Sequence, residues 1–252
     1  MKKTTKHQSH HSLTGAIACA LAILALGAGS ATTQAAATAD KDSVTAIDIL
    51  LHPDATMIQH AEAVNTRLRG VFPEGFALDA SHRPHISMFQ CFVPTAQLKK
   101  VYAAADKVLA GANVTALKLK AVKYYYIPDK SLGLSGIVAE PTPELIKLQQ
   151  DLIDAVSPFT VKTATSDAFV TTPKDPVINP LLIHYVEVFA TEHAGKHFLP
   201  HVTTGLAPKE YLDKMLAEPF ESFTFSPAGA AVYHLGHFGT AAKKLKQFDL
   251  KP

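Results

Sequence analysis

The stretch Arg83-Pro84-His85-Ile86-Ser87-Met88-Phe89 is matched later in the chain by Leu199-Pro200-His201-Val202-Thr203-Thr204-Gly205. In each, Pro and His are followed by a β-branched apolar residue and then by a hydroxyl residue. Proline is tolerated at the first residue of a strand, and Ile and Val favour the pleated, half-buried surface that follows. Both stretches therefore predict strands, on which side chains two residues apart share a face.

The two predicted strands carry the same polar face. His85 and Ser87 lie on one face of the first strand, and His201 and Thr203 lie on one face of the second. Two imidazoles and two hydroxyls around one cleft are the groups that acid–base chemistry on a bound oxyanion requires. His-x-Ser alone is a weak signal, because His7-Gln8-Ser9 carries it too. The matching Pro and apolar residue in both copies favour a functional pair over two half-buried strands that happen to carry histidine.

The N-terminal residues have the composition of an export signal. Three lysines among the first six residues precede an apolar run from Leu13 to about Gly29, and Ala35-Ala36-Ala37 follows. This pattern is typical of a secretory signal peptide, here residues 1–37, with residues 38–43 as a disordered tail. We expect a periplasmic or secreted protein with no membrane span after the signal is removed, because no second long apolar run follows.

The remaining chain is long enough for one two-lobed domain, residues 44–252, which we expect to be a monomer. The full chain has 24 Lys and Arg against 22 Asp and Glu, and the three leader lysines account for more than this excess. A nearly neutral mature protein is unlike a general binder of large nucleic acids, but it is compatible with a small nucleotide or oligonucleotide. Of the two cysteines only Cys91 lies outside the leader, so we expect no internal disulfide and a small core residue.

Hydrophobic periodicity and turn residues predict an α+β chain with many hairpins. The expected strands are 44–51, 84–92, 117–122 with its continuation 124–127, 132–138, 200–206, 220–225, 230–235 and 245–250. The expected helices are 55–68 between Asp54 and a C-cap at Gly70, 95–110, 143–156 behind Thr142, and 208–217, whereas 181–189 fits a strand or a helix. Residues 160–180 are polar and Pro-rich, which predicts an insertion or loop.

A helix and two strands follow each Pro-His strand, which suggests a duplication. The strands and helices are segregated as in α+β proteins, not alternating as in a parallel sheet. We therefore expect a bilobal duplicated fold, with two antiparallel sheets and flanking helices around a central cleft.

Further substrate contacts are expected near the first motif and in the strand that follows it. Tyr124 and Tyr126 can supply a stacking face for a base, although strand core is an alternative for both. Arg83 precedes the first motif and can contact a phosphate, with a solvated loop as the alternative.

Two other functions remain open. His193, His197 and His201 are spaced four apart, as in metal sites on helices, and a histidine-rich periplasmic metal-binding protein is one alternative. Gly195 and Pro200 within this run argue against one continuous helix. The other alternative is a protein that binds a nucleotide without catalysis, against which the intact motifs in both halves argue.

Pro84-His85-Ile86-Ser87 and Pro200-His201-Val202-Thr203 resemble the paired His-x-Ser/Thr signatures of the two-histidine phosphoesterase superfamily. This superfamily includes the bacterial 2′,5′-RNA ligase-like proteins and the cyclic nucleotide phosphodiesterases. The stretch from Leu117 to Val156 resembles its two strands and following helix, and the likeness extends over about Val44 to Leu250.

The resemblance implies a bilobal α+β fold with a pseudo-twofold axis. It also implies hydrolysis of a 2′,3′-cyclic phosphate, or transfer at a 2′,5′-phosphodiester. In this chemistry His85 and His201 exchange protons with water and the leaving ribose oxygen, and Ser87 and Thr203 donate to the non-bridging oxygens. This scheme requires neither a metal nor another cofactor.

Overall fold

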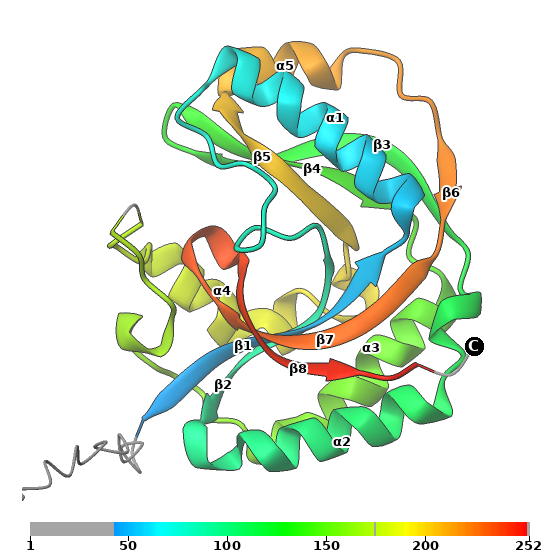
Figure 1. Cartoon of the computed structure of the whole chain (residues 1–252), viewed down its shortest axis with the longest axis vertical. Helices are drawn as coiled ribbons and strands as arrows, with labels where there is room; N and C mark the ends of the chain where they lie inside the picture. Colours follow the sequence, from blue (N-terminus) through cyan, green and yellow to red (C-terminus); the bar gives the residue numbers. More distant parts are fainter. Residues whose placement is uncertain (1–42, 174, 251–252) are drawn as a thin grey trace, which may run out of the picture. The chain divides into compact units, whose positions relative to one another are not determined.

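The computed structural model describes residues 43–173 and 175–250 (Figure 1). The expected signal peptide and nearly all of the expected tail lie outside the described residues. The elements are, in order, β1 (Val44–Pro53), α1 (Ala55–Val71), β2 (Ile86–Pro94), α2 (Leu98–Gly111), β3 (Leu119–Asp129), β4 (Leu132–Ala139), α3 (Pro143–Val156), α4 (Pro180–Glu192), β5 (His201–Pro208), α5 (Lys209–Leu216), β6 (Phe223–Phe225), β7 (Pro227–Leu235) and β8 (Ala241–Phe248).

Two four-stranded sheets carry the structure, and all their neighbouring strands are antiparallel. The first sheet has the order β2-β1-β7-β8, and the second has the order β5-β4-β3-β6. The predicted α+β fold with two antiparallel sheets and flanking helices is confirmed. The strands that follow the two Pro-His dipeptides, β2 and β5, each lie at an edge of their sheet.

The two sheets do not correspond to the two halves of the sequence. The first sheet takes β1 and β2 from one end of the chain and β7 and β8 from the other, and the second takes the four strands between them. Each Pro-His strand is followed by a helix and two strands, as expected, but these elements do not form a sheet of their own. The strands β3 and β4 follow β2 in sequence, but β4 pairs with β5.

The helices connect the two sheets. Helix α1 lies between β1 and β2 in sequence but packs on β5 of the second sheet, whereas α3 and α4 lie between β4 and β5 but contact β2 of the first sheet. Figure 1 shows α1 beside the second sheet and α2 and α3 together on the first. One large apolar core contains residues of both sheets and of these helices.

A buried amide holds α1 against β5. The side-chain nitrogen of Asn65 in α1 donates to the carbonyl oxygens of Thr204 (2.8 Å) and Phe76 (3.0 Å), and its oxygen accepts from the backbone N–H of Leu78 (3.3 Å). Gly205 follows in β5 with φ of +141°, and a Cβ there would lie 2.9 Å from the amide nitrogen of Asn65. Glycine is therefore the residue that allows this close approach.

Polar caps explain where the helices begin. Asp54 accepts from the N–H groups of Thr56 and Met57 at the start of α1, as the sequence predicts. Residues 181–189 are helical, because Asn179 caps α4 and Pro180 occupies its first position. The predicted C-cap at Gly70 is wrong, since α1 ends at Val71 and Phe72 is its C-cap.

The described residues of 160–173 and 175–179 form no strand or α-helix, but parts of this segment are packed. Ala168 and Phe169 are buried against Phe92 and Ala46 on the face of the first sheet opposite the large core. The ring of Phe169 meets that of Phe92 edge-on. Within residues 43–173 and 175–250, no helix is both long and apolar enough to cross a membrane.

The α1–β5 contact predicts a large effect of Asn65→Ala on stability. The substitution leaves buried carbonyl oxygens without a donor, so we expect the free energy of unfolding to fall by ~1–3 kcal/mol in urea denaturation. Asn113→Ala is the control, because Asn113 is exposed and makes no capping hydrogen bond. Equal effects of the two substitutions would contradict the proposed contact.

Candidate active site

The four polar residues of the two motifs line one cleft. His85 and Ser87 enter it from β2, and His201 and Thr203 enter it from β5. The cleft has a volume of about 160 Å³. Helix α4, the end of β3 and the turn before β8 complete its walls.

The ring of His85 lies between two acceptors. Its Nδ1 is 2.6 Å from the carbonyl oxygen of Arg83, and its Nε2 is 3.5 Å from Oδ2 of Asp48. Burial alone would lower the pKa of His85, but the neighbouring carboxylate of Asp48 outweighs burial and raises it. His85 therefore carries a positive charge over a wider range of pH than an ordinary histidine.

The ring of His201 has a different environment. Its Nδ1 is 2.8 Å from the carbonyl oxygen of Leu199, so Nδ1 carries the hydrogen, and no described residue forms a hydrogen bond with Nε2. Burial, with a smaller contribution from the charge of His85, lowers the pKa of His201 to about 4. At neutral pH this imidazole is neutral, and its free nitrogen can accept a proton.

Asp48 is part of the site, although the sequence did not identify it. Its carboxylate in β1 is fully buried, and Oδ2 accepts from Oγ of Ser87 at 2.5 Å and from Nε2 of Gln90 at 3.3 Å. Gln90 also donates to Oγ of Ser87 at 3.1 Å. The available signal was a carboxylate in the middle of an otherwise apolar strand.

Tyr125, and not its neighbours, faces the histidines. Its ring meets that of His201 edge-on, with 4.8 Å between the ring centres. Gly136, its partner on β4, provides the space, because a Cβ there would lie 2.5 Å from the Tyr125 ring.

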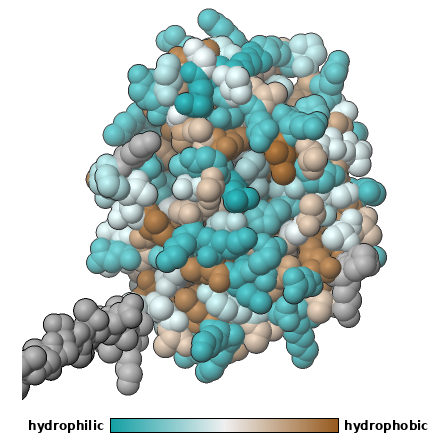
Figure 2. All heavy atoms as spheres, viewed as in Figure 1, coloured by the Kyte–Doolittle hydropathy of each residue, from teal (hydrophilic) through white to brown (hydrophobic). Residues whose placement is uncertain are grey.

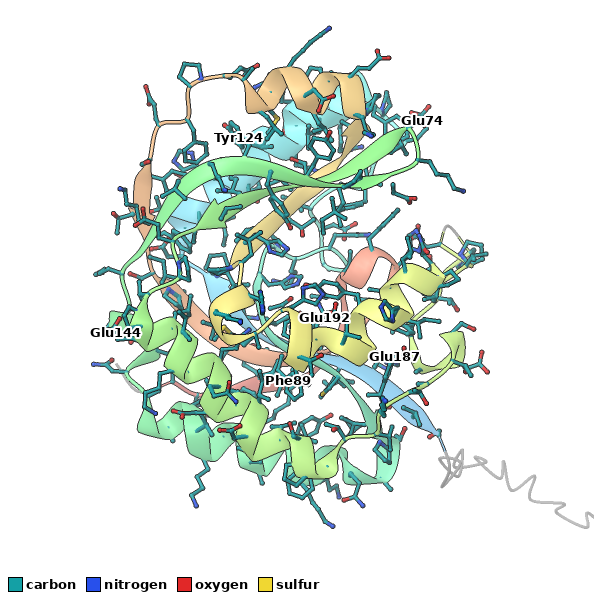
Figure 3. The ribbon with its side chains drawn as sticks, turned by 180° about the vertical axis from the view of Figure 1, so that it is seen from behind. Glu74, Phe89, Tyr124, Glu144, Glu187 and Glu192 are labelled. Atoms are coloured by element: carbon teal, nitrogen blue, oxygen red, sulfur yellow. The ribbon has the colours of Figure 1, made fainter. Side chains whose placement is uncertain are left out.

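Tyr124 and Tyr126 lie on the other face of β3, which differs from the expected placement. Tyr124 meets Phe220 edge-on, and Figure 3 shows it on the side of the sheet where α5 lies. The hydroxyl of Tyr126 donates to Asp213 of α5 at 2.6 Å. The reason is a register shift between Ala121 and Lys123, which moves the core-facing positions of β3 from odd to even numbers.

The side chain of Arg83 is exposed and does not line the cleft, unlike the expected phosphate contact. Its charge acts instead on two other residues. It contributes to the lowered pKa of His52, for which burial and the charge of His85 are the larger causes. It also opposes the rise that burial causes in the pKa of Tyr233. The contribution of Arg83 to the site is its carbonyl oxygen, which holds the ring of His85.

The alternative metal site has no ligand set in the described part of the chain, where no three His, Cys, Asp or Glu side chains group closely enough to hold an ion. His193 ends α4 and stacks on Tyr185 with 4.1 Å between the ring centres. His197 lies in the short 3-10 turn Gly195–His197 that follows.

No protein-family model matches the sequence, and no curated protein is a match. Among solved structures, TT0787 of Thermus thermophilus is 16% identical, with 82% of this chain and 98% of that chain covered and a TM-score of 0.50. LigT of E. coli is 13% identical over 83% and 99% of the two chains, with a TM-score of 0.41. Usb1 of Kluyveromyces marxianus is 10% identical over 82% and 99%, with a TM-score of 0.41.

The likeness to TT0787 concerns the fold, since the sequences are only 16% identical. The fold places His-x-Ser and His-x-Thr on the edge strands of two antiparallel sheets, facing one cleft. This chain therefore has the bilobal, duplicated fold of the two-histidine phosphoesterase superfamily.

Proposed function

We propose that this protein is a phosphoesterase that acts on a 2′,3′-cyclic phosphate or a 2′,5′-phosphodiester of a nucleotide or short RNA. The observation that carries the proposal is the arrangement of His85 and His201. They enter one cleft from separate sheets, and one ring is surrounded by acceptors while the other has a free nitrogen. Acid–base catalysis needs one protonated and one neutral imidazole.

The two histidines divide the proton transfers of hydrolysis. Nε2 of His201 takes a proton from water as the water oxygen forms a bond to phosphorus. The bond from phosphorus to one ribose oxygen breaks, and that oxygen receives the proton of Nε2 of His85. Thr203 faces the same cleft and can donate to a non-bridging oxygen, where negative charge develops.

The walls of the cleft favour a small substrate. Of the described residues that line it, none is Lys or Arg, and several are apolar: Ile127, Pro128, Leu134, Leu181, Leu182 and Phe238. The imidazolium of His85 can balance the single charge of a phosphodiester, and the apolar walls can accept a base. A long RNA would need a basic surface along its backbone.

The N-terminal residues are the basis for a proposal about the cellular location of the protein. We also propose that the protein is exported to the periplasm or secreted, which the lysines and apolar run of residues 1–37 support, and that it acts as a monomer. On the face seen in Figure 2, hydrophobic residues occur in small groups among hydrophilic ones, as is usual for a protein in water.

Replacing either histidine should slow turnover of a nucleoside 2′,3′-cyclic phosphate by ~10²–10⁴-fold, because each substitution removes one proton transfer. The variants His85→Ala and His201→Ala are compared with His60→Ala, whose ring stacks on Phe223 away from the cleft. The product, a 2′- or a 3′-monophosphate, identifies the bond that breaks, and a 2′,5′-linked dinucleotide tests the second substrate class. Near wild-type turnover in either cleft variant would reject the mechanism.

Activity should also survive dialysis against a strong chelator, because the proposed proton transfers use side chains only. The measurement is turnover before and after dialysis, with Zn²⁺ and Mn²⁺ added back separately. A loss that either ion restores would favour a metal mechanism instead, with His193, His197 and His201 as the first ligands to replace.

A further inference from the structure

We propose that Asp48 is a positioning residue that holds His85 in its protonated form and so makes it the general acid, leaving His201 as the base. This inference rests on the proposed function. It assigns one role to each histidine, using contacts made by residues outside the two Pro-His motifs.

The first observation is the burial of Asp48. Its side chain has no exposed surface and does not line the cleft, and Oδ1 is buried without a partner among the described residues. A buried carboxylate is costly unless charges or donors surround it. Ser87 and Gln90 supply two donors to Oδ2, and the nearest group that can carry a positive charge is the ring of His85, 3.5 Å away.

The second observation is the hydrogen bonding of the two rings. Both nitrogens of His85 face acceptors, the carbonyl oxygen of Arg83 and the carboxylate of Asp48. The carbonyl oxygen takes the hydrogen of Nδ1, whereas the carboxylate, 3.5 Å from Nε2, is beyond a normal hydrogen-bond length and favours a positive charge on the ring, so the hydrogen of Nε2 remains available to a leaving oxygen in the cleft. His201 has one acceptor, the carbonyl oxygen of Leu199, and the neutral form with its hydrogen on Nδ1 satisfies it.

The third observation is a difference between two otherwise equivalent pairs of strands. In the first sheet Leu50 pairs with Ser87 and Ile49 with Phe89, and the second sheet repeats this bulge, where Gly136 pairs with Thr203 and Ser135 with Gly205. The next pair beyond the bulge is Asp48 with Gln90 in the first sheet, but Leu134 with Leu206 in the second. The duplicated fold therefore places a carboxylate behind His85 and a leucine at the equivalent position near His201.

The charges of Asp48 and His85 also act on the titratable groups around them. Burial is the main cause of the raised pKa of Cys91 and of Tyr185, and the carboxylate of Asp48 is the second cause. Burial is also the main cause of the lowered pKa of His52 and of His201, and the charge of His85 lowers both further. The charged or titratable groups around the pair are His52 in β1, Cys91 in β2, Tyr185 in α4, His201 in β5 and Arg83 in the preceding loop.

The assignment also changes the role of Ser87. Its hydroxyl donates to Asp48, so its hydrogen is committed to the carboxylate and not to a phosphate oxygen. Thr203, at the equivalent position of the second sheet, has no such acceptor among the described residues and remains the hydroxyl that can donate to substrate.

The test is NMR titration of the imidazoles in the wild type and in Asp48→Asn, which keeps the shape and removes the charge. In the wild type we expect His85 to titrate above its ordinary value of 6.5 and His201 near 4. In Asp48→Asn the pKa of His85 should fall by ~1–3 pH units, the usual effect of a nearby opposite charge. Asp79→Asn is the matched control, because Asp79 pairs with His82 (3.0 Å) and neither lines the cleft.

The same variants are assayed for turnover of a 2′,3′-cyclic nucleotide against pH. Asp48→Asn should move the alkaline limb to lower pH and leave the acid limb in place, so turnover should fall more at pH 8 than at pH 5.5, by up to ~10-fold for each pH unit that the pKa of His85 falls. Asp79→Asn should leave both limbs unchanged.

The titration separates this inference from the proposed function. A wild-type His85 that titrates at or below 6.5, or an unchanged pKa in Asp48→Asn, would overturn the role of Asp48 even if the enzyme is active. A lowered pKa of His85 in Asp48→Asn, with no turnover of any cyclic nucleotide or 2′,5′-dinucleotide by the wild type, would support the electrostatic role and reject the proposed function.

Discussion

The strands that carry the two histidines, β2 and β5, are edge strands. Each packs against a helix that follows, in the sequence, a strand of the other sheet. Helix α1 leaves β1 and packs on β5, and α3 and α4 leave β4 and contact β2. Separating the sheets would expose the large core that they share and break the buried hydrogen bonds of Asn65. The distance between β2 and β5, and with it the width of the cleft, is therefore fixed by the main core and not by loops. A site built on such a scaffold keeps its geometry without a bound ligand.

The duplication supplies equal geometry, and a few buried residues supply unequal chemistry. Both motifs begin with Pro-His, hold Nδ1 on a carbonyl oxygen two residues earlier, and contain the same bulge. The difference lies in the strand pair next to each bulge, where Asp48 and Gln90 occupy positions that Leu134 and Leu206 occupy in the other sheet. A buried carboxylate costs several kcal/mol unless its surroundings compensate. Its presence beside only one histidine is accounted for if that histidine must be charged.

The local patterns of the sequence predicted the fold class, most elements and the shared cleft, because Pro-His followed by alternating residues leaves few alternatives to a strand. Local patterns could not predict which strands pair when they are distant in the sequence. For example, β4 pairs with β5, although it comes after β2 and β3 in the chain. The bulge between Ala121 and Lys123 is equally invisible in the sequence, yet it decides that Tyr125 faces the site while Tyr124 and Tyr126 face away. Alternation along β1 could not identify Asp48 as a buried carboxylate, because both faces of this strand are buried.

The central claim is that one charged and one neutral imidazole act together on a phosphodiester across one cleft. The measurement that tests it most directly is the turnover of a nucleoside 2′,3′-cyclic phosphate by the wild type from pH 3.5 to 9.5. The account predicts a bell, with an acid limb near pH 4 where His201 becomes protonated, and an alkaline limb above 6.5 where the coupled site loses the proton of His85. Turnover that rises steadily to alkaline pH, or no turnover at any pH, would contradict it.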